Sequence, residues 1–202
     1  MSLLNSISVR VPDEKEIPQI VDIHRSELAY TLNSQMGSSH LAALYLTMLE
    51  SPDCWVLAAF DENFPVGLVS GSLDMEKVKT EILRNFSAVN WMNLLFRFIR
   101  NPLLIQEWRR GVLIGKPVRT LGQPVNAILT TIAVRKDHQR MGIGERLIQA
   151  LEDEFLRRGV DIYRLDTTLA NTGSRAFYKR LGFRELEQRS DSVVLIKRIE
   201  TS

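Results

Sequence analysis

Two kinds of apolar pattern alternate along this chain of 202 residues. Short apolar or alternating runs, bounded by turn residues, predict strands at 7–11, 54–60, 65–73, 126–134, 161–169, 183–189 and 192–199. Apolar residues that recur every three or four positions predict helices at 13–28, 38–50, 144–158 and 174–181. Strands that alternate with helices are typical of an α/β fold, and we expect a single domain over residues 1–202.

The segment 75–111 interrupts this alternation. Its pattern is helical until Pro102, which favours a bent element of two helices. Large apolar side chains, among them Trp91, Phe96 and Phe98, stand there beside arginines, so the segment is too apolar to be left in water. Three roles stay open: a lid over a substrate cleft, which is the preferred one, a dimer contact, or a basic amphipathic helix on a membrane.

Composition and charge argue against several classes of protein. With 45% hydrophobic and 25% charged residues, the chain is typical of a globular protein. The formal net charge of +2 is too small to indicate a nucleic-acid partner. No run of 18 apolar residues predicts a membrane span, and the first residues lack the pattern of a secretion signal, so we expect a cytoplasmic protein.

The cysteine and the histidines indicate neither a thiol nucleophile nor a metal site. Cys54, the single cysteine, lies beside Trp55 in a predicted strand, which favours a small core side chain. His24 and His138 have no partner at a spacing typical of metal ligands, so we predict no metal.

The stretch RKDHQRMGIGERLIQAL, residues 135–151, joins a predicted strand to an amphipathic helix. The helix begins at Gly142 to Gly144, where N–H groups without an intrahelical acceptor and the helix dipole favour an anion. Side-chain donors precede it at Arg135, Lys136, Gln139 and Arg140. The P-loop pattern is absent, and Leu147 replaces the third glycine of the dinucleotide fingerprint. We therefore predict a phosphate or pyrophosphate cradle of another kind.

A second motif, read together with this one, resembles the GNAT superfamily of N-acetyltransferases. The first motif, Q-x-x-G-x-G, opens a helix after a strand, and the second, N-x-x-S-x-x-F-Y-x-x-x-G-F, follows the next strand. The residues that carry the resemblance are Gln139, Gly142, Gly144, Asn171, Ser174, Phe177, Tyr178, Gly182 and Phe183. The resemblance is close over 125–187 and does not extend to 75–111, where the family has a short connection.

The resemblance implies a GNAT-type α/β fold, with a mixed, mostly antiparallel sheet, helices on both faces and, here, 75–111 as a helical insertion. It also implies acetyl-coenzyme A as cosubstrate. The pyrophosphate would be held at Gln139, Arg140, Met141, Gly142, Ile143 and Gly144. Main-chain groups of Ile132, Ala133 and Val134 would bind the pantetheine arm, which Asn171 and Ser174 would also contact.

The same resemblance implies catalytic roles for two residues. Tyr178 would give the departing thiolate its proton, and Asp166 on the preceding strand would act as the base. Asp166 is one methylene shorter than the glutamate of relatives, and a turn contact or a pair with Arg164 or Arg175 stays an alternative. In the family, the first helices line the acceptor site. The secondary candidates are therefore Glu27, Tyr30 and His40.

We therefore expect acetyl transfer to the primary amine of a small molecule, such as an amino sugar. A protein N-terminus or lysine as acceptor, and a non-catalytic module that binds acyl-coenzyme A, stay as alternatives. Beyond the coenzyme and the amine, we expect no nucleic acid and, apart from the open roles of 75–111, no membrane partner. A homodimer stays open.

Overall fold

The computed structural model of the chain describes residues 6–85, 91–92, 95–96, 99–100, 118–120 and 123–200. The strands of the main sheet are β1 (Ile7–Arg10), β2 (Cys54–Asp61), β3 (Phe64–Ser72), β6 (Ile128–Val134), β7 (Ile162–Thr168), β8 (Arg184–Gln188) and β9 (Ser192–Arg198). The α-helices are α1 (Ile17–Glu27), α2 (Leu32–Gln35), α3 (Ser38–Glu50), α4 (Met75–Asn85), α7 (Ile143–Arg157) and α8 (Thr172–Arg180). The remaining described elements are the 3-10 helices η2 (Glu14–Glu16) and η3 (Lys136–His138) and a hairpin of β4 (Val118–Thr120) and β5 (Gln123–Val125).

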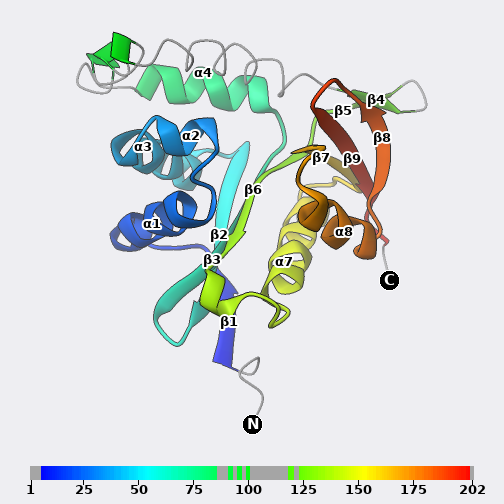
Figure 1. Ribbon diagram of the computed structural model, residues 1–202, viewed down its shortest axis with the longest axis horizontal. Coiled ribbons are helices and arrows are strands. Elements are labelled where there is room, and N and C mark those ends of the chain that lie inside the picture. Colours follow the sequence, from blue (N-terminus) through cyan, green and yellow to red (C-terminus); the bar gives the residue numbers. More distant parts are fainter. Residues whose placement is uncertain are drawn as a thin grey trace.

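The seven main strands form one sheet in the order β1-β2-β3-β6-β7-β9-β8 (Figure 1). Every neighbouring pair is antiparallel except β6 and β7. These two run parallel because α7 carries the chain back between them, as a crossover helix does. The prediction of an α/β fold with a mixed, mostly antiparallel sheet is therefore confirmed.

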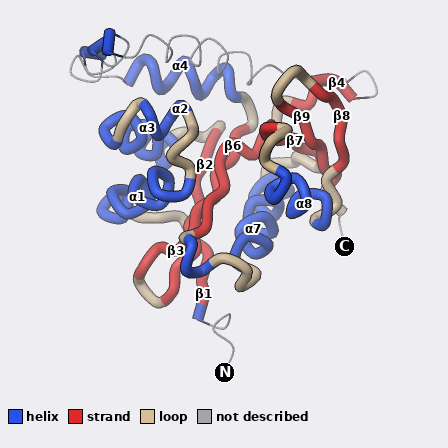
Figure 2. Tube along the Cα trace, in the orientation of Figure 1, coloured by secondary structure: helices blue, strands red, loops and turns tan. Residues whose placement is uncertain are grey.

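Helices cover both faces of this sheet (Figure 2). On one face, α1 and α3 bury a cluster against the strands that includes Ile20 and Leu41. On the other face, α7 buries Leu147, Leu151 and Phe155, which recur every fourth residue as its sequence pattern predicts. The sheet is thus the middle layer of three, and its two buried clusters lie on either side of it.

Short elements differ from the sequence-based expectations. The patterns do not predict α2, η2 or the β4–β5 hairpin, because three or four residues are too few to show a period. The helix expected over 13–28 is instead η2 followed by α1, and Pro18 stands in the first turn of α1, where the missing N–H costs no hydrogen bond. Helix α3 spans Ser38–Glu50 as predicted.

The first part of the segment 75–111 is helical, as predicted. Helix α4 is capped by the Asp74 carboxylate, which accepts from the N–H groups of Glu76 at 3.0 Å and Lys77 at 3.3 Å. The described positions between 91 and 100 are helical as well. Pro102 lies outside the described residues, so the bend stays a prediction. No helix within the described ranges has the length and apolar character needed to cross a membrane.

Cys54 is fully buried in β2, which confirms it as a core side chain. Burial raises the pKa of its thiol to about 11. A thiol that keeps its proton at neutral pH is a poor nucleophile, and this agrees with the absence of a predicted catalytic role.

Candidate functional site

The sheet opens between β6 and β7. The two strands pair at one register position, Ile128 with Arg164, where the Arg164 N–H donates to Ala127 O at 3.0 Å. Beyond that point they diverge (Figure 1), while each keeps its antiparallel neighbour on the other side. One edge of β6 therefore borders a gap inside the sheet.

The hydrogen bonds to β3 decide which main-chain groups of β6 face this gap. The Arg135 N–H donates to Val66 O at 2.8 Å, and every second residue of an antiparallel strand bonds to the same neighbour. Ala133 therefore turns its N–H and C=O toward β3, whereas Ile132 and Val134 turn theirs toward β7. Ile132 and the N–H of Val134 can offer main-chain hydrogen bonds to a ligand in the gap, whereas Val134 O accepts from the Gln139 side chain and the groups of Ala133 are used within the sheet.

A β-bulge in β6 lies near the closed end of the gap. Thr131 opposes Ser70 but Leu129 opposes Gly71, so Thr130 is the additional residue. Its hydroxyl lies 2.7 Å from the Ser70 hydroxyl. Bulges bend a strand, re-aim its side chains and are frequent beside active sites.

The loop from β6 to α7 presents backbone donors. Arg140 and Gly142 have positive φ angles of 63° and 79°, a left-handed backbone that favours anion-binding arrangements of N–H groups. At the start of α7, the N–H groups of Gly142, Ile143 and Gly144 have no acceptor within the helix. Gly142 is also the N-cap of α7, whose dipole adds partial positive charge there. The cradle predicted from the sequence therefore includes the donor end of α7, and its role in anion binding stays a prediction.

Glu27 and Gln139 hold this loop in place. The Glu27 carboxylate accepts from the Lys136 N–H at 3.2 Å and from the Gln139 side-chain amide at 3.3 Å. The same amide nitrogen donates to Val134 O, at the end of β6, at 2.9 Å. Both side chains are used within the protein, where they fix the position of the loop backbone.

Gly144 has a packing role as well as its predicted ligand role. A Cβ atom at Gly144 would lie 3.2 Å from the Phe177 ring of α8, which is closer than carbon atoms approach without movement. The missing side chain thus allows α7 and α8 to approach each other. This contact brings the second sequence motif beside the first.

Helix α8 begins with Asn171 and carries Tyr178 on its buried side. The Asn171 side-chain oxygen accepts from the Ser174 N–H at 3.1 Å, which leaves the amide nitrogen to donate to a ligand. Tyr178 is 6% exposed, and its ring centroid lies 5.3 Å from that of Phe183. The neighbouring Phe177 is only partly buried against the same core cluster.

The Tyr178 hydroxyl holds its proton firmly. Burial raises the pKa of Tyr178, and the phenol of Tyr30 raises it further. Tyr30 lies between α1 and α2 and is 62% exposed. The turn that carries Tyr30 and the helix that carries Tyr178 therefore lie close enough for their hydroxyl groups to interact.

Asp166 lies in a buried network of ion pairs. One carboxylate oxygen pairs with Arg164, and the other lies 3.4 Å from Nη1 of Arg189. Arg164 is fully buried and also donates to Val125 O at 3.3 Å. Burial raises the pKa of Asp166, and the two guanidinium groups oppose that rise. The structure thus contains the alternative pair with Arg164, and both oxygens of the carboxylate are engaged.

A buried hydrogen-bond chain links α1, α3 and β6. His24 Nδ1 lies 2.6 Å from Tyr45 Oη, and His24 Nε2 lies 3.3 Å from Thr31 Oγ1. Because the Thr31 hydroxyl donates to Leu28 O, Nε2 carries the ring proton and Nδ1 accepts from Tyr45. Tyr45 also hydrogen-bonds to Thr131, next to the bulge. The chain ties the turn that carries Tyr30 to the strand that borders the gap.

The three histidines all have protein partners. Burial lowers the pKa of His24 to about 4, so its ring is neutral at pH 7. His40, a secondary candidate for the acceptor side, lies with Nε2 3.3 Å from Asn33 Oδ1. Across the described ranges, no three His, Cys, Asp or Glu side chains gather as a metal site requires.

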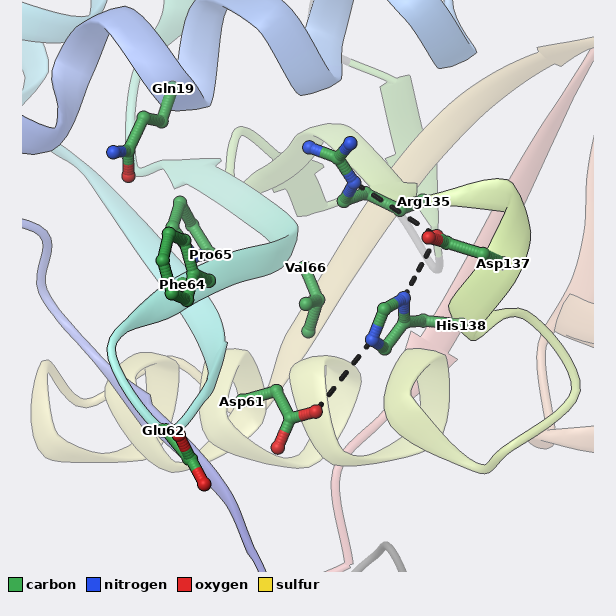
Figure 3. A pocket seen from close by; sticks show the side chains of 9 residues that line it. All are labelled: Gln19, Asp61, Glu62, Phe64, Pro65, Val66, Arg135, Asp137 and His138. Carbon is green, nitrogen blue, oxygen red and sulfur yellow. Dashed lines mark hydrogen bonds and ion pairs between the residues drawn. The ribbon is translucent and has the colours of Figure 1, made fainter.

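A pocket of about 560 Å³ lies at the turn between β2 and β3, beside η3 (Figure 3). His138 stands in it between Asp137 at 2.8 Å and Asp61 at 3.8 Å. Arg135, expected as a donor of the cradle, also lines the pocket, with Nε 3.9 Å from Asp137. Of the described residues that line it, none belongs to 139–144, so this pocket is separate from the backbone donors of the cradle.

Comparison with known sequences finds a match to part of a family model and two kinds of relative. Residues 99–183 match the Acetyltransferase (GNAT) family. The chain is 42% identical over 59 residues to the ribosomal protein bS18-alanine N-acetyltransferase of Escherichia coli (strain K12), which is 29% of this chain and 40% of that protein. It is 26% identical over 110 residues to N-alpha-acetyltransferase 30 of Schizosaccharomyces pombe, which is 54% of this chain and 70% of that protein. The match thus spans about two fifths of the length of the bacterial relative.

Comparison with solved structures finds the same fold. The PaiA N-acetyltransferase of Thermoplasma acidophilum, in complex with coenzyme A, matches with a TM-score of 0.63 and 14% sequence identity. The match covers 96% of this chain and 99% of that chain. At this identity, the likeness shows a shared fold.

Proposed function

Because residues 99–183 match the Acetyltransferase (GNAT) family, we propose that the chain transfers the acetyl group of acetyl-coenzyme A to an amine. This proposal rests on one observation. The backbone donors of the loop 140–144 lie beside the edge of β6 that is not paired with β7. The donors suit a pyrophosphate, which is an anion with many acceptor oxygens. The open edge suits an extended arm with amide groups. Acetyl-coenzyme A has both parts in one molecule.

The proposed position of the coenzyme runs from the loop into the gap. The pyrophosphate accepts hydrogen bonds from the N–H groups of Arg140, Met141, Gly142, Ile143 and Gly144. The pantetheine amides pair with the main-chain groups of Ile132 and Val134, as an added strand pairs with the edge of a sheet. Asn171 and Ser174, at the start of α8, contact the arm from the other side.

Tyr178 is the proposed general acid. The amine nitrogen attacks the thioester carbonyl carbon, the C–S bond breaks, and the departing thiolate takes a proton. Because burial raises the pKa of Tyr178, its hydroxyl keeps a proton to give until the thiolate forms. Tyr178 lies two helical turns beyond Asn171, so one side of α8 can serve both the arm and the thioester.

The base is a separate question, because the amine must lose a proton before it attacks. The base role of Asp166 stays a prediction. Its ion pairs with Arg164 and Arg189 favour a role in holding β7 beside the gap. Water in the open gap can accept the proton if Asp166 does not.

For the acceptor we propose the primary amine of a small molecule, such as an amino sugar. Tyr30 offers an exposed hydroxyl on the acceptor side, and the nearby Glu27 carboxylate is engaged by the loop rather than open to a cationic peptide. A protein N-terminus is the second candidate. It is favoured by the identity to an alanine N-acetyltransferase and to an N-alpha-acetyltransferase.

A thiol-release assay tests the activity and the acceptor together. The chain is given acetyl-coenzyme A with an amino sugar, with a peptide that begins with alanine, or with no amine. Release that depends on the sugar supports the first candidate, and release that depends on the peptide supports the second. Coenzyme binding in calorimetry without release for any amine would indicate a binding module, and no coenzyme binding would contradict the cradle.

A further inference from the structure

Exposed apolar side chains are concentrated in one short stretch of the described chain. Of the ten exposed large apolar side chains among the described residues, five lie between 91 and 99. They are Trp91 (46% exposed), Met92 (64%), Leu95 (60%), Phe96 (57%) and Ile99 (69%). The other five are scattered along the sequence, as is normal for a protein surface. A concentration of this kind marks an interaction surface.

These five side chains, which we call the docking face, all stand at described helical positions. The described positions from 91 to 100 are helical, and at 100° per residue the five fall within an arc of about 140°. The Arg100 guanidinium lies at the border of this arc, 5.0 Å from the centroid of the Phe96 ring. An apolar face bordered by cations is typical of a helix that lies in a membrane interface.

Positive charge is concentrated in the same part of the sequence. Residues 82–120 contain seven of the 26 lysines and arginines and only one of the 24 aspartates and glutamates. This segment therefore carries a formal charge of +6, although the whole chain carries +2 and the remainder is net negative. The mild average charge conceals a strong asymmetry along the sequence, which favours an anionic partner for this segment.

We propose that the docking face binds the surface of an anionic lipid bilayer. A bilayer supplies acyl chains to bury Met92, Leu95 and Ile99 and phosphate headgroups to pair with arginine. A nucleic acid offers no hydrocarbon for aliphatic side chains, and a second copy of this chain would bring two positive segments together. At 1.5 Å per residue, a helix from Trp91 to Ile99 would be about 13 Å long, less than half of the hydrocarbon core, so we expect peripheral binding.

The docking face lies away from the proposed coenzyme site. In Figure 1, the helical pieces of this stretch lie beyond the end of α4, on the side remote from α7 and α8. A molecule bound to a membrane through this face keeps the gap between β6 and β7 open. Docking uses none of the residues beside that gap, so it is independent of the proposed reaction. The lid expected of 75–111 stays a prediction, and residues 101–111 lie outside the described residues.

Co-sedimentation of the full chain with lipid vesicles tests this docking. One set of vesicles is phosphatidylcholine alone, and the other is phosphatidylcholine mixed with phosphatidylglycerol. We expect binding to the mixed vesicles that added salt weakens, and at least tenfold weaker partitioning to the neutral ones. The double variant Leu95→Ser/Ile99→Ser should lose at least tenfold in partitioning to the mixed vesicles, because two aliphatic side chains no longer enter the acyl region.

Phe64→Ser provides the matched control. Phe64 is 70% exposed at the turn between β2 and β3, outside the docking face, so this variant should partition like the wild type. Thermal unfolding shows whether each variant is folded. If the double variant unfolds, Arg100→Gln keeps the apolar face and should still lose severalfold of the binding to the mixed vesicles.

Several results would overturn the proposal. These are equal binding to both kinds of vesicle, no vesicle binding, or unchanged partitioning of a folded double variant. A dimer in sedimentation velocity that the double variant abolishes would assign the face to a second copy of the chain. Binding to single-stranded DNA without vesicle binding would assign the positive charge to a nucleic acid.

Discussion

The Tyr178 hydroxyl is one group on which the whole proposed reaction depends. We predict that Tyr178→Phe keeps coenzyme affinity and lowers turnover by about 10² to 10⁴, the range for loss of a positioned general acid. The ring would still pack against Phe177 and Phe183, while the proton donor is lost. Steady-state thiol release and titration calorimetry measure the two quantities. A variant with full turnover would exclude Tyr178 as the acid.

Asp166 is expected to contribute mainly to stability. Asp166→Asn removes the carboxylate that pairs with the fully buried Arg164, which should cost about 3 to 5 kcal/mol of unfolding free energy. Urea denaturation measures this cost. Glu187→Gln is the control: Glu187 pairs with Arg189 but its side chain is 50% exposed, so the loss should be below about 1 kcal/mol.

The pH profile of Asp166→Asn decides the base role separately. Turnover that is low at neutral pH and recovers as the pH rises would show that the carboxylate removes the proton of the amine. Turnover of the folded variant that follows the wild type at every pH would leave Asp166 with its structural role alone.

His24 should make stability depend on pH. Burial lowers its pKa from 6.5 to about 4 in the folded chain, so between these values the unfolded state binds more protons. Its contribution is complete above pH 6.5 and is lost as the pH falls toward 4, by up to roughly 3 kcal/mol. His24→Asn, whose side-chain oxygen can accept from Tyr45, should flatten this part of the stability profile. If the difference in stability between wild type and variant is constant over the window, the buried ring does not titrate as expected.

At the scale of the element, length decides what the sequence can predict. The thirteen residues of α3 show enough apolar recurrence to predict it from Ser38 to Glu50, and α7 begins one residue before its predicted start. The four residues of α2 cannot show a period, and this turn is held by Thr31, which accepts from the Ser34 N–H. The sequence pattern cannot predict the bulge in β6 either, because a bulge is defined by the register between β6 and β3.

The candidate site likewise has a part that the sequence can predict and a part that it cannot. Its two motifs are continuous in sequence, so Gly142, Asn171 and Tyr178 could be predicted. Its supporting contacts join distant segments: Glu27 and Gln139 are 112 positions apart, and His24 is 21 positions from Tyr45. No periodicity within one segment can predict such pairs. They follow from the way the sheet brings α1, α3 and the loop together.

The start of α7 carries a prediction of its own. Gly142→Val should weaken coenzyme binding at least tenfold, about 1.4 kcal/mol, because φ of 79° disfavours a branched side chain and the loop donors would move. Gly159→Val is the matched control, since Gly159 has φ of 75° at the other end of α7 with open space around its Cβ position. It should be strained to a similar extent yet bind coenzyme normally. Calorimetry on the folded variants makes the comparison, and equal weakening in both would mean that strain alone is responsible.

At the scale of the whole molecule, the sheet consists of two antiparallel parts. β1, β2, β3 and β6 form one part, and β7, β9 and β8 form the other. The two parts pair directly at Ile128 and Arg164, and α7 connects them along the chain. A ligand that fills the gap would therefore act as a bridge between the parts, so its effect should extend beyond the residues that it touches.

Coenzyme binding should accordingly protect selected amides and stabilise the chain. At 100 times the dissociation constant, coenzyme A should raise the unfolding free energy by about 2.7 kcal/mol. Hydrogen exchange at the N–H groups of Ile132 and Val134 should slow most, because they face the gap and gain acceptors from the pantetheine arm. Ala133 is an internal control: its N–H already bonds to β3, so its exchange should change only with global stability. Residue-resolved exchange by NMR, with and without coenzyme A, measures all three. Equal protection of the three amides would show that the coenzyme stabilises the chain without pairing to this edge.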